Sequence, residues 1–253
     1  MEPITSADRV NAALLGSLLA LGLIVGGWLL GAEIKATRLG DRFVAVKGLA
    51  ERTVKSDLAI WPLNYKEAGD DLTSLYAKTE ADKQTLLNFL DQQGLRSSEI
   101  ELGVIRVVDT QANEFGAPNR AAHRYIVEQQ ITVRTSRVDQ VAAAAQKTMQ
   151  LLQKGIVLSN NIGQGVIYKF TGLNAIKPDM ITEATRNARA AADRFASDSG
   201  SKVGAIRQAN QGIFSILPAD AGSENEMGVG DGGNSSLKKT VRVVTSTQYY
   251  LEN

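Results

Sequence analysis

Residues 240–251, TVRVVTSTQYYL, alternate between two sets of side chains along their whole length. A period of two residues is typical of a β-strand with one buried face. The segment contains no Pro or Gly, so it is predicted to form a long, uninterrupted strand. Two long segments are therefore candidates for an unpaired sheet edge: this strand, which has nothing to block its backbone groups, and residues 43–65, which Pro62 partly blocks. The buried face would comprise Val241, Val243, Thr245, Thr247, Tyr249 and Leu251.

The pattern upstream of this strand alternates between period two and period 3.6. A helix is expected to begin at a cap at Asp70 or Asp71 and to end at Gly94. A half-buried strand at 125–133 is expected to run antiparallel to the strand that precedes the loop 109–122. Further helices are predicted at 136–154 and 178–199, and further strands at 43–46, 58–65, 100–108, 166–171 and 203–217. This order predicts an α+β fold, a mainly antiparallel sheet with three helices packed on one face.

Several residues in these elements carry more specific expectations. Gly48 interrupts its strand as a bulge, and Pro62 favours an edge position or a local break. Ser136 and Asp139 resemble a capping box, and Pro178 fits the first turn of its helix. That last helix has an alanine-rich face suited to close approach on a sheet, formed by Ile181, Ala184, Ala188, Ala191, Ala192 and Phe195.

Residues 10–32 form an uncharged, mainly apolar run between Arg9 and Glu33. The run is long enough to cross a bilayer as a helix of roughly 20 residues. The alternative is a cleavable signal peptide, but Leu30 stands where such a peptide needs a small residue. We therefore expect a tail at 1–9, a transmembrane anchor at 10–32, a stalk at 33–42 and one domain at 43–253. The Lys and Arg residues that flank the run do not settle its orientation.

The anchor carries small residues four positions apart, Gly22 with Gly26 and Gly27 with Gly31. This spacing lets two membrane helices approach closely, so these glycines are candidate oligomerisation residues. In the domain, strand edges and the long loop 109–122 are expected to contact a neighbouring copy, since loops of that length are often functional. The loop residues proposed for this contact are Asn113, Phe115 and Arg120.

The chain has few residues of the types that commonly act in catalysis or bind metal ions. The chain has no Cys and a single His, and its net charge is +1, with 28 basic and 27 acidic residues spread without long blocks. Thiolate metal sites and cysteine nucleophiles are therefore excluded, and no clustered basic face predicts nucleic-acid binding. His123 lacks a G-x-S-x-G partner, and residues 228–233 match a phosphate-loop spacing but precede a strand instead of a helix. We expect no enzyme activity, no cofactor and no metal site; a carboxylate-only enzyme is the least favoured reading.

The order of motifs from Phe43 to Leu251 resembles the SIMPL-domain family of bacterial envelope proteins. The strongest match is the alanine-rich segment from Glu183 to Ile206, which includes Gly200 and Gly204. Weaker matches are Val46-Lys47-Gly48 with Asp57, the junction from Leu90 to Ile100, and Arg124-Tyr125 with the strand to Val133. Two positions depart from the pattern, because Ser56 replaces a Pro and Arg124 stands where Gly is usual.

The resemblance implies a membrane-anchored or periplasmic protein that self-associates. Some members of the family form rings or channel-like assemblies, and some are linked to oxidative-stress defence; none has an established catalytic residue. It implies an inner-membrane protein with one span, its main domain in the periplasm, and membrane lipid, further copies and other envelope proteins as partners. The alternative hypothesis is a ligand- or partner-binding module that signals envelope stress without a large assembly.

Overall fold

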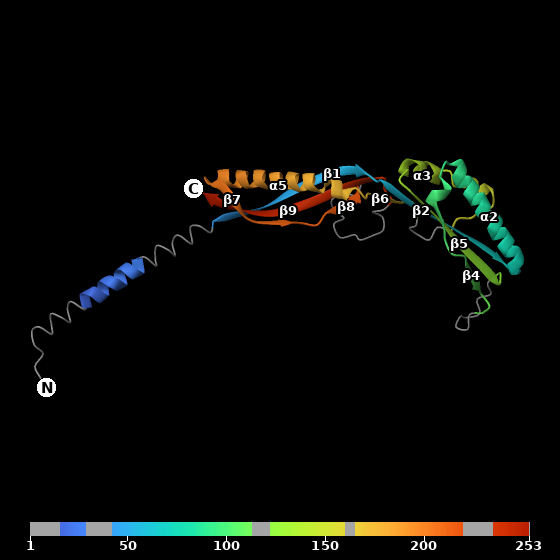
Figure 1. The fold of residues 1–253 in the computed structure, drawn as a ribbon, viewed down its shortest axis with the longest axis horizontal. Helices are drawn as coiled ribbons and strands as arrows, with labels where there is room; N and C mark the ends of the chain where they lie inside the picture. The colour runs from blue at the N-terminus through green and yellow to red at the C-terminus, as the bar shows by residue number, and fades with distance from the viewer. Residues whose placement is uncertain (1–15, 29–41, 113–121, 160–164, 220–234, 253) are drawn as a thin grey trace, which may run out of the picture. The chain divides into compact units, whose positions relative to one another are not determined.

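The computed structural model describes residues 16–28, 42–112, 122–159, 165–219 and 235–252. Within these ranges the fold is α+β, with five helices and two mainly antiparallel sheets (Figure 1). The fold class is therefore confirmed, but the expected single sheet is wrong. Of the described residues, those within 16–49, 182–212 and 244–252 form one compact unit, and those within 50–181 and 213–243 form a second.

The first sheet has the order β1-β9-β7, and β8 also pairs with β9. Its strands are β1 (Phe43–Lys55), β7 (Lys202–Gln211), β8 (Ser215–Pro218) and β9 (Lys238–Glu252). The predicted face of β9 is confirmed, because Val241, Val243, Thr245, Thr247 and Tyr249 are all buried. The expectation that β9 is an edge is wrong, since β1 flanks it on one side and β7 and β8 on the other.

The second sheet has the order β3-β5-β2-β6, and β4 also pairs with β5. Its strands are β2 (Leu58–Gly69), β3 (Ile100–Leu102), β4 (Arg106–Asp109), β5 (Tyr125–Thr135) and β6 (Ile167–Lys169). The antiparallel pairing across the loop is confirmed by Asp109 opposite Tyr125. Pro62 lies on an interior strand, opposite Thr132 of β5, but β6 reaches only to Ile60 on the other side of β2.

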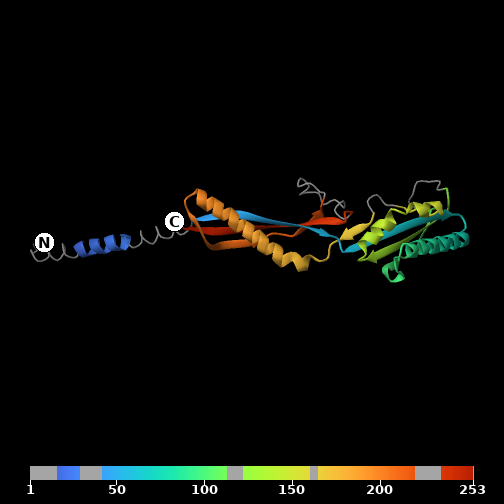
Figure 2. The same ribbon diagram turned by 90° about the horizontal axis from the view of Figure 1, so that it is seen from above.

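One face of the second sheet is covered by α2 (Leu72–Gln92) and α3 (Val138–Ala145), as Figure 2 shows. Asp71 caps α2 by accepting a hydrogen bond from the Ser74 N–H, and Gly94 follows it with a φ of 76°, so both predicted ends are confirmed. Leu72 and Tyr76, both in the first turns of α2, are exposed. The shared core includes Leu63, Tyr65, Leu86, Phe89, Leu90, Ile131, Val133 and Val141.

The predicted helix at 136–154 is divided into α3 and a short α4 (Met149–Gln153). Its expected capping box is wrong, because Arg137 is the N-cap and makes no side-chain capping bond. The Asp139 carboxylate instead accepts a hydrogen bond from Lys55 Nζ at 2.5 Å. The helix begins one residue later than the spacing predicted, so Ser136 and Asp139 do not occupy the capping positions.

Helix α5 (Leu173–Asp198) packs on the first sheet through its alanines, of which Ala184, Ala188 and Ala192 are fully buried. A Cβ added to Gly48 of β1 would lie 1.9 Å from the Ala184 carbonyl oxygen, so glycine is required for this close approach. Gly48 therefore serves helix packing and does not interrupt β1. The helix begins before Pro178, which lies inside it, and Phe195 is 61% exposed, contrary to expectation.

Residues 16–28 form a helix within the predicted anchor, while 10–15 and 29–32 lie outside the described residues. In the parts of the chain that are described, no helix combines the length and the apolar character needed to span a bilayer. The apolar side chains of this helix are nevertheless exposed: Leu18, Leu19, Leu21, Leu23, Ile24, Val25 and Trp28.

Candidate functional site

The glycines proposed for oligomerisation are only partly described. Gly22, Gly26 and Gly27 lie in the helix 16–28, and a Cβ added at any of them would meet no atom within 4 Å. Gly31, Asn113, Phe115 and Arg120 lie outside the described residues. The structure therefore brings none of these residues together, and their proposed role remains a prediction.

His123 lies beside Asp70, where β2 ends. Its Nδ1 is 3.3 Å from Asp70 Oδ2, and the other oxygen of that carboxylate accepts a hydrogen bond from the Arg124 N–H at 2.9 Å. These two contacts, the backbone one first, lower the pKa of Asp70. The Arg124 guanidinium in turn binds Asp109 at 3.1 Å. This exposed network joins the ends of three strands, and no hydroxyl nucleophile bonds to the His123 ring among the described contacts.

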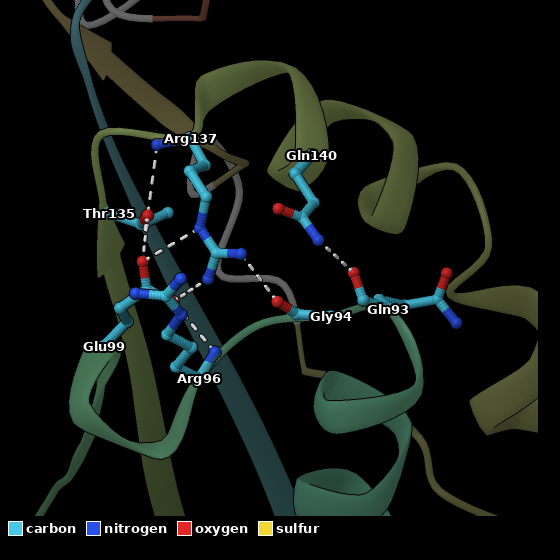
Figure 3. Close-up of polar contacts among 7 residues, drawn as sticks. All are labelled: Gln93, Gly94, Arg96, Glu99, Thr135, Arg137 and Gln140. Atoms are coloured by element: carbon cyan, nitrogen blue, oxygen red, sulfur yellow. Dashed lines mark hydrogen bonds and ion pairs between the residues drawn. The ribbon is translucent and has the colours of Figure 1, made fainter.

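A denser polar cluster surrounds Glu99 beyond the C-terminus of α2 (Figure 3). Glu99 belongs to the short helical turn η1 (Ser97–Glu99), and its carboxylate accepts hydrogen bonds from Thr135 Oγ1 at 2.6 Å and the Arg96 N–H at 2.8 Å. The Arg137 guanidinium donates to both carboxylate oxygens. These donors, Arg137 first, lower the pKa of Glu99 to about 2.

The same arginine also ties the cluster to the end of α2. Its Nη1 donates to the Gly94 carbonyl at 2.8 Å, and Gln140 of α3 donates to the Gln93 carbonyl at 2.7 Å (Figure 3). The carbonyl groups at a helix C-terminus lack intrahelical partners, so these donors satisfy them. The cluster therefore fastens α2, β5 and α3 to one another, and its carboxylate is held ionised by donors that leave it little capacity for proton transfer.

A second carboxylate environment lies between α2 and β2, where Asp82 faces Glu67. Lys78 forms an ion pair with Glu67 at 2.5 Å, and the Glu67 side chain is only 10% exposed. Burial, followed by the facing Glu67 carboxyl, raises the pKa of Asp82 to about 6. Asp82 Oδ2 is buried and accepts no hydrogen bond from any described residue. Burial beside the Glu67 carboxyl thus favours retention of a proton on Asp82.

Tyr65 lies on the same face of β2 as Glu67 and is fully buried. Its hydroxyl donates to Gln129 Oε1 of β5 at 2.5 Å and also lies 3.3 Å from the Thr79 carbonyl of α2. Burial and the nearby carboxylates of Asp82, Glu80 and Glu67 raise the pKa of Tyr65. The phenol therefore stays neutral, and it links the helix to two strands.

Two facing carboxyl groups would support acid–base chemistry only if substrate could reach them. A cavity of about 280 Å³ opens on the uncovered face of the second sheet, lined by Asn64, Lys66, Arg106, Glu128, Gln130 and Ser159 among others. Neither Glu67 nor Asp82 lines it. Among the described residues, no group of three or more His, Asp or Glu side chains could hold a metal ion.

The alternation and helix spacing could have located the second carboxylate pair in advance. On β2, Glu67 follows Leu63 and Tyr65 at the two-residue spacing of the buried face. On α2, Asp82 lies on the buried side of the helix, between Thr79 and Leu86. A charged residue in an apolar stripe is a signal of a buried partner. The pairing of Glu99 with Arg137 had no such signal, because it depends on how α3 packs against the end of α2.

The fold is α+β, and the polar clusters described above mainly link its own helices and strands to one another. The model of the SIMPL family, described as a protein of unknown function (DUF541), matches residues 44–249. The chain therefore belongs to the SIMPL family. No curated protein matches the sequence.

Proposed function

We propose that this SIMPL-family chain is a non-enzymatic envelope protein, anchored in the inner membrane by residues 10–32, whose periplasmic domains assemble into a homo-oligomer. The observation that carries the proposal is the exposure of the helix 16–28, where Leu23 and Ile24 are each 69% exposed and Trp28 is 73% exposed. Removing such a surface from water is strongly favourable, and a bilayer or neighbouring copies would accomplish it. A role in envelope or oxidative-stress defence rests on the family resemblance.

The anchor is tested by fractionation of cells that produce the full chain. The protein should sediment with membranes, resist extraction at high pH and require detergent for recovery. Protease added outside spheroplasts should digest the domain. Recovery of the intact chain in solution without detergent would contradict the anchor, and protection from the protease would reverse the orientation.

The packing of membrane helices is tested by Gly26→Leu, which fills the gap needed for close backbone approach. We expect a lower oligomer mass in detergent, with unchanged domain folding. Ser17→Leu is the control, because residue 17 lies on the opposite side of the helix from residue 26 at about 100° per residue. An equal decrease in oligomer mass in both variants, or no decrease in either, would contradict a specific contact between the helices.

The cavity on the second sheet favours a second candidate function, a ligand-binding module. Its volume of about 280 Å³ and its amide, hydroxyl and guanidinium lining suit a small polar ligand. A strictly monomeric protein whose melting temperature rises with such ligands would favour this alternative over assembly.

A further inference from the structure

Strands β3 and β4 together form one edge of the second sheet. Both pair with β5, and no described strand pairs with their outer side. The edge exposes four large apolar side chains: Leu102 is 55% exposed, Val104 92%, Ile105 37% and Val107 50%. It contains neither Lys nor Pro from Ile100 to Val108, the residues that commonly protect an edge from pairing with another chain.

A one-residue bulge separates β3 from β4. Leu102 is opposite Ile131 and Arg106 is opposite Glu128, so three residues of the edge span the place of two on β5. The Gly103 N–H donates to the Gln130 carbonyl at 2.8 Å, and a Cβ on Gly103 would lie only 2.8 Å from that oxygen. Glycine therefore permits the bulge at this position.

The bulge changes which side chains share a face. Glu101 is opposite Thr132 and Arg106 is opposite Glu128, and these two β5 residues are four apart and hence on the same, uncovered face. In a regular strand, Glu101 and Arg106 would lie on opposite faces because they are five apart. Ile100, Leu102 and Val107 are opposite Val133, Ile131 and Val127, whose side chains are all buried on the covered face.

This arrangement makes the edge complementary to a second copy of itself. If two copies pair antiparallel about a two-fold axis between Gly103 and Val104, Glu101 of each copy is opposite Arg106 of the other. On the covered face, Ile100 is then opposite Val107 and Leu102 is opposite Ile105, and Gly103 leaves room for the exposed Val104. Directly opposite charges and apolar pairs are what stabilise antiparallel neighbours.

We propose that residues 100–107 form an isologous interface in which two copies of this chain extend the second sheet edge to edge. The proposal rests on the self-association in the proposed function and names the surface that carries it. Glu101 already lies 3.5 Å from Arg134 in its own chain, whereas Arg106 makes no ion pair within the part of the chain that the structure describes. The second copy supplies a carboxylate to that guanidinium.

Charge reversal tests the pairing directly in the detergent-purified full chain. Arg106→Glu places like charges opposite each other twice across the two-fold axis, and so does Glu101→Arg. Each should weaken the dimerisation step by about tenfold or more, measured by sedimentation over a range of concentrations. Mixing the two variants, or combining both substitutions in one chain, should restore the affinity. Lys169→Glu is the control for charge on the same face, because Lys169 is exposed and lies on β6 at the other edge of the sheet.

Disulfide trapping provides a second readout, because the chain contains no cysteine of its own. Val104→Cys lies beside the two-fold axis and should give a covalent dimer on mild oxidation. Val157→Cys replaces another exposed valine, 60% accessible, and should not. The trap should also be lost when Arg106→Glu is added.

The outcomes separate this inference from the proposed function. An oligomer whose mass and affinity are unchanged in both charge variants overturns the edge interface while self-assembly stands. If both charge variants dimerise more weakly and mixing them does not restore the affinity, the edge interface is also overturned, because Glu101 and Arg106 would then not be opposite each other. A wild-type chain that is monomeric at all concentrations overturns self-assembly and this interface together.

Discussion

Glu99 and Asp82 both contact the elements around α2, yet their environments shift their pKa values in opposite directions. Glu99 receives hydrogen bonds from Arg137, Thr135 and the backbone, and its pKa falls to about 2. Asp82 is buried against the carboxyl of Glu67, and its pKa rises to about 6. Glu99 therefore stabilises the fold at neutral pH, whereas the ionised Asp82 opposes it.

The difference shows that burial without enough donors raises the pKa of a carboxyl group, whereas a full set of donors lowers it. The Glu99 side chain is 18% exposed and has a guanidinium for both oxygens, whereas the single lysine near Asp82 is already paired with Glu67. Donor-rich groups of this kind fasten a fold, while donor-poor pairs make its stability depend on pH.

The largest effect is expected when the donor-rich site is broken. Glu99→Gln should lower the free energy of unfolding by about 2–3 kcal/mol at pH 7, because it leaves Arg137 without its charge partner. The native pKa lies below the unfolded value of 4.5, so this contribution is complete above that value and is lost as the pH falls towards 2. Urea unfolding of the full chain in detergent at pH 7 and pH 3 measures the difference.

Glu51→Gln is the control for that experiment, since Glu51 forms an exposed pair with Arg242 and should change stability by less than about 0.5 kcal/mol. A Glu99→Gln variant as stable as this control at pH 7 would show that the cluster does not fasten α2.

Replacing Asp82, whose carboxyl group has few hydrogen-bond donors, should stabilise the protein. Asp82→Asn should raise the free energy of unfolding by about 1–2 kcal/mol at pH 8, a value reduced for partial solvent screening. Because the native pKa is raised from 3.8 to about 6, wild-type stability falls as the pH rises through this interval, and the advantage of the variant should disappear near pH 4. Thermal unfolding at pH 4, 6 and 8 provides the comparison.

Asp91→Asn, an exposed change on the same helix, should leave the pH profile unchanged. If Asp82→Asn also leaves it unchanged, or destabilises the protein at pH 8, the assignment of opposite signs to the two carboxylates is wrong.

The smallest effect on stability is expected from replacing Lys78, the lysine that lies near both carboxyl groups. Lys78→Met removes the cation that lowers the pKa of Asp82, so Asp82 should titrate at a higher pH than in the wild type. The stability cost at pH 8 should be about 0.5 kcal/mol, because the Lys78 side chain is 60% exposed. Carbon-detected NMR of the side-chain carboxyl groups follows the titration. Lys83→Met, which affects the Glu80 pair instead, should leave the Asp82 titration in place.

The elements that the sequence predicted well are those with long, consistent periodicity. The alternation of β9, the buried alanines of α5 and both ends of α2 are all confirmed. The division into two sheets could not be predicted, because Lys55, Ser56 and Asp57 read as an ordinary turn. In the structure Asp57 instead accepts hydrogen bonds from the Thr171 and Gly172 N–H groups, while β1 and β2 pair in different sheets.

Much of the candidate site was outside the reach of sequence patterns. The inward positions of Glu67 and Asp82 follow from the periodicity of β2 and α2, but their proximity depends on tertiary packing. The Glu99 cluster depends on three elements meeting, and the bulge that aligns Glu101 with Arg106 is visible only in the strand register. Local patterns determine which face a residue occupies, whereas distant segments determine what it meets.

The central position of β9 has a consequence for the order of folding during synthesis. Strand β1 is made before all of the second sheet, yet its partner β9 is made after α5, β7 and β8. The second sheet can pair β2 with β5 while β1 still lacks its neighbour. Closing the large loop between β1 and β9 is entropically costly and slow. A nascent chain therefore exposes the apolar face of β1 for most of its synthesis, and a chaperone that binds extended segments would find its target there.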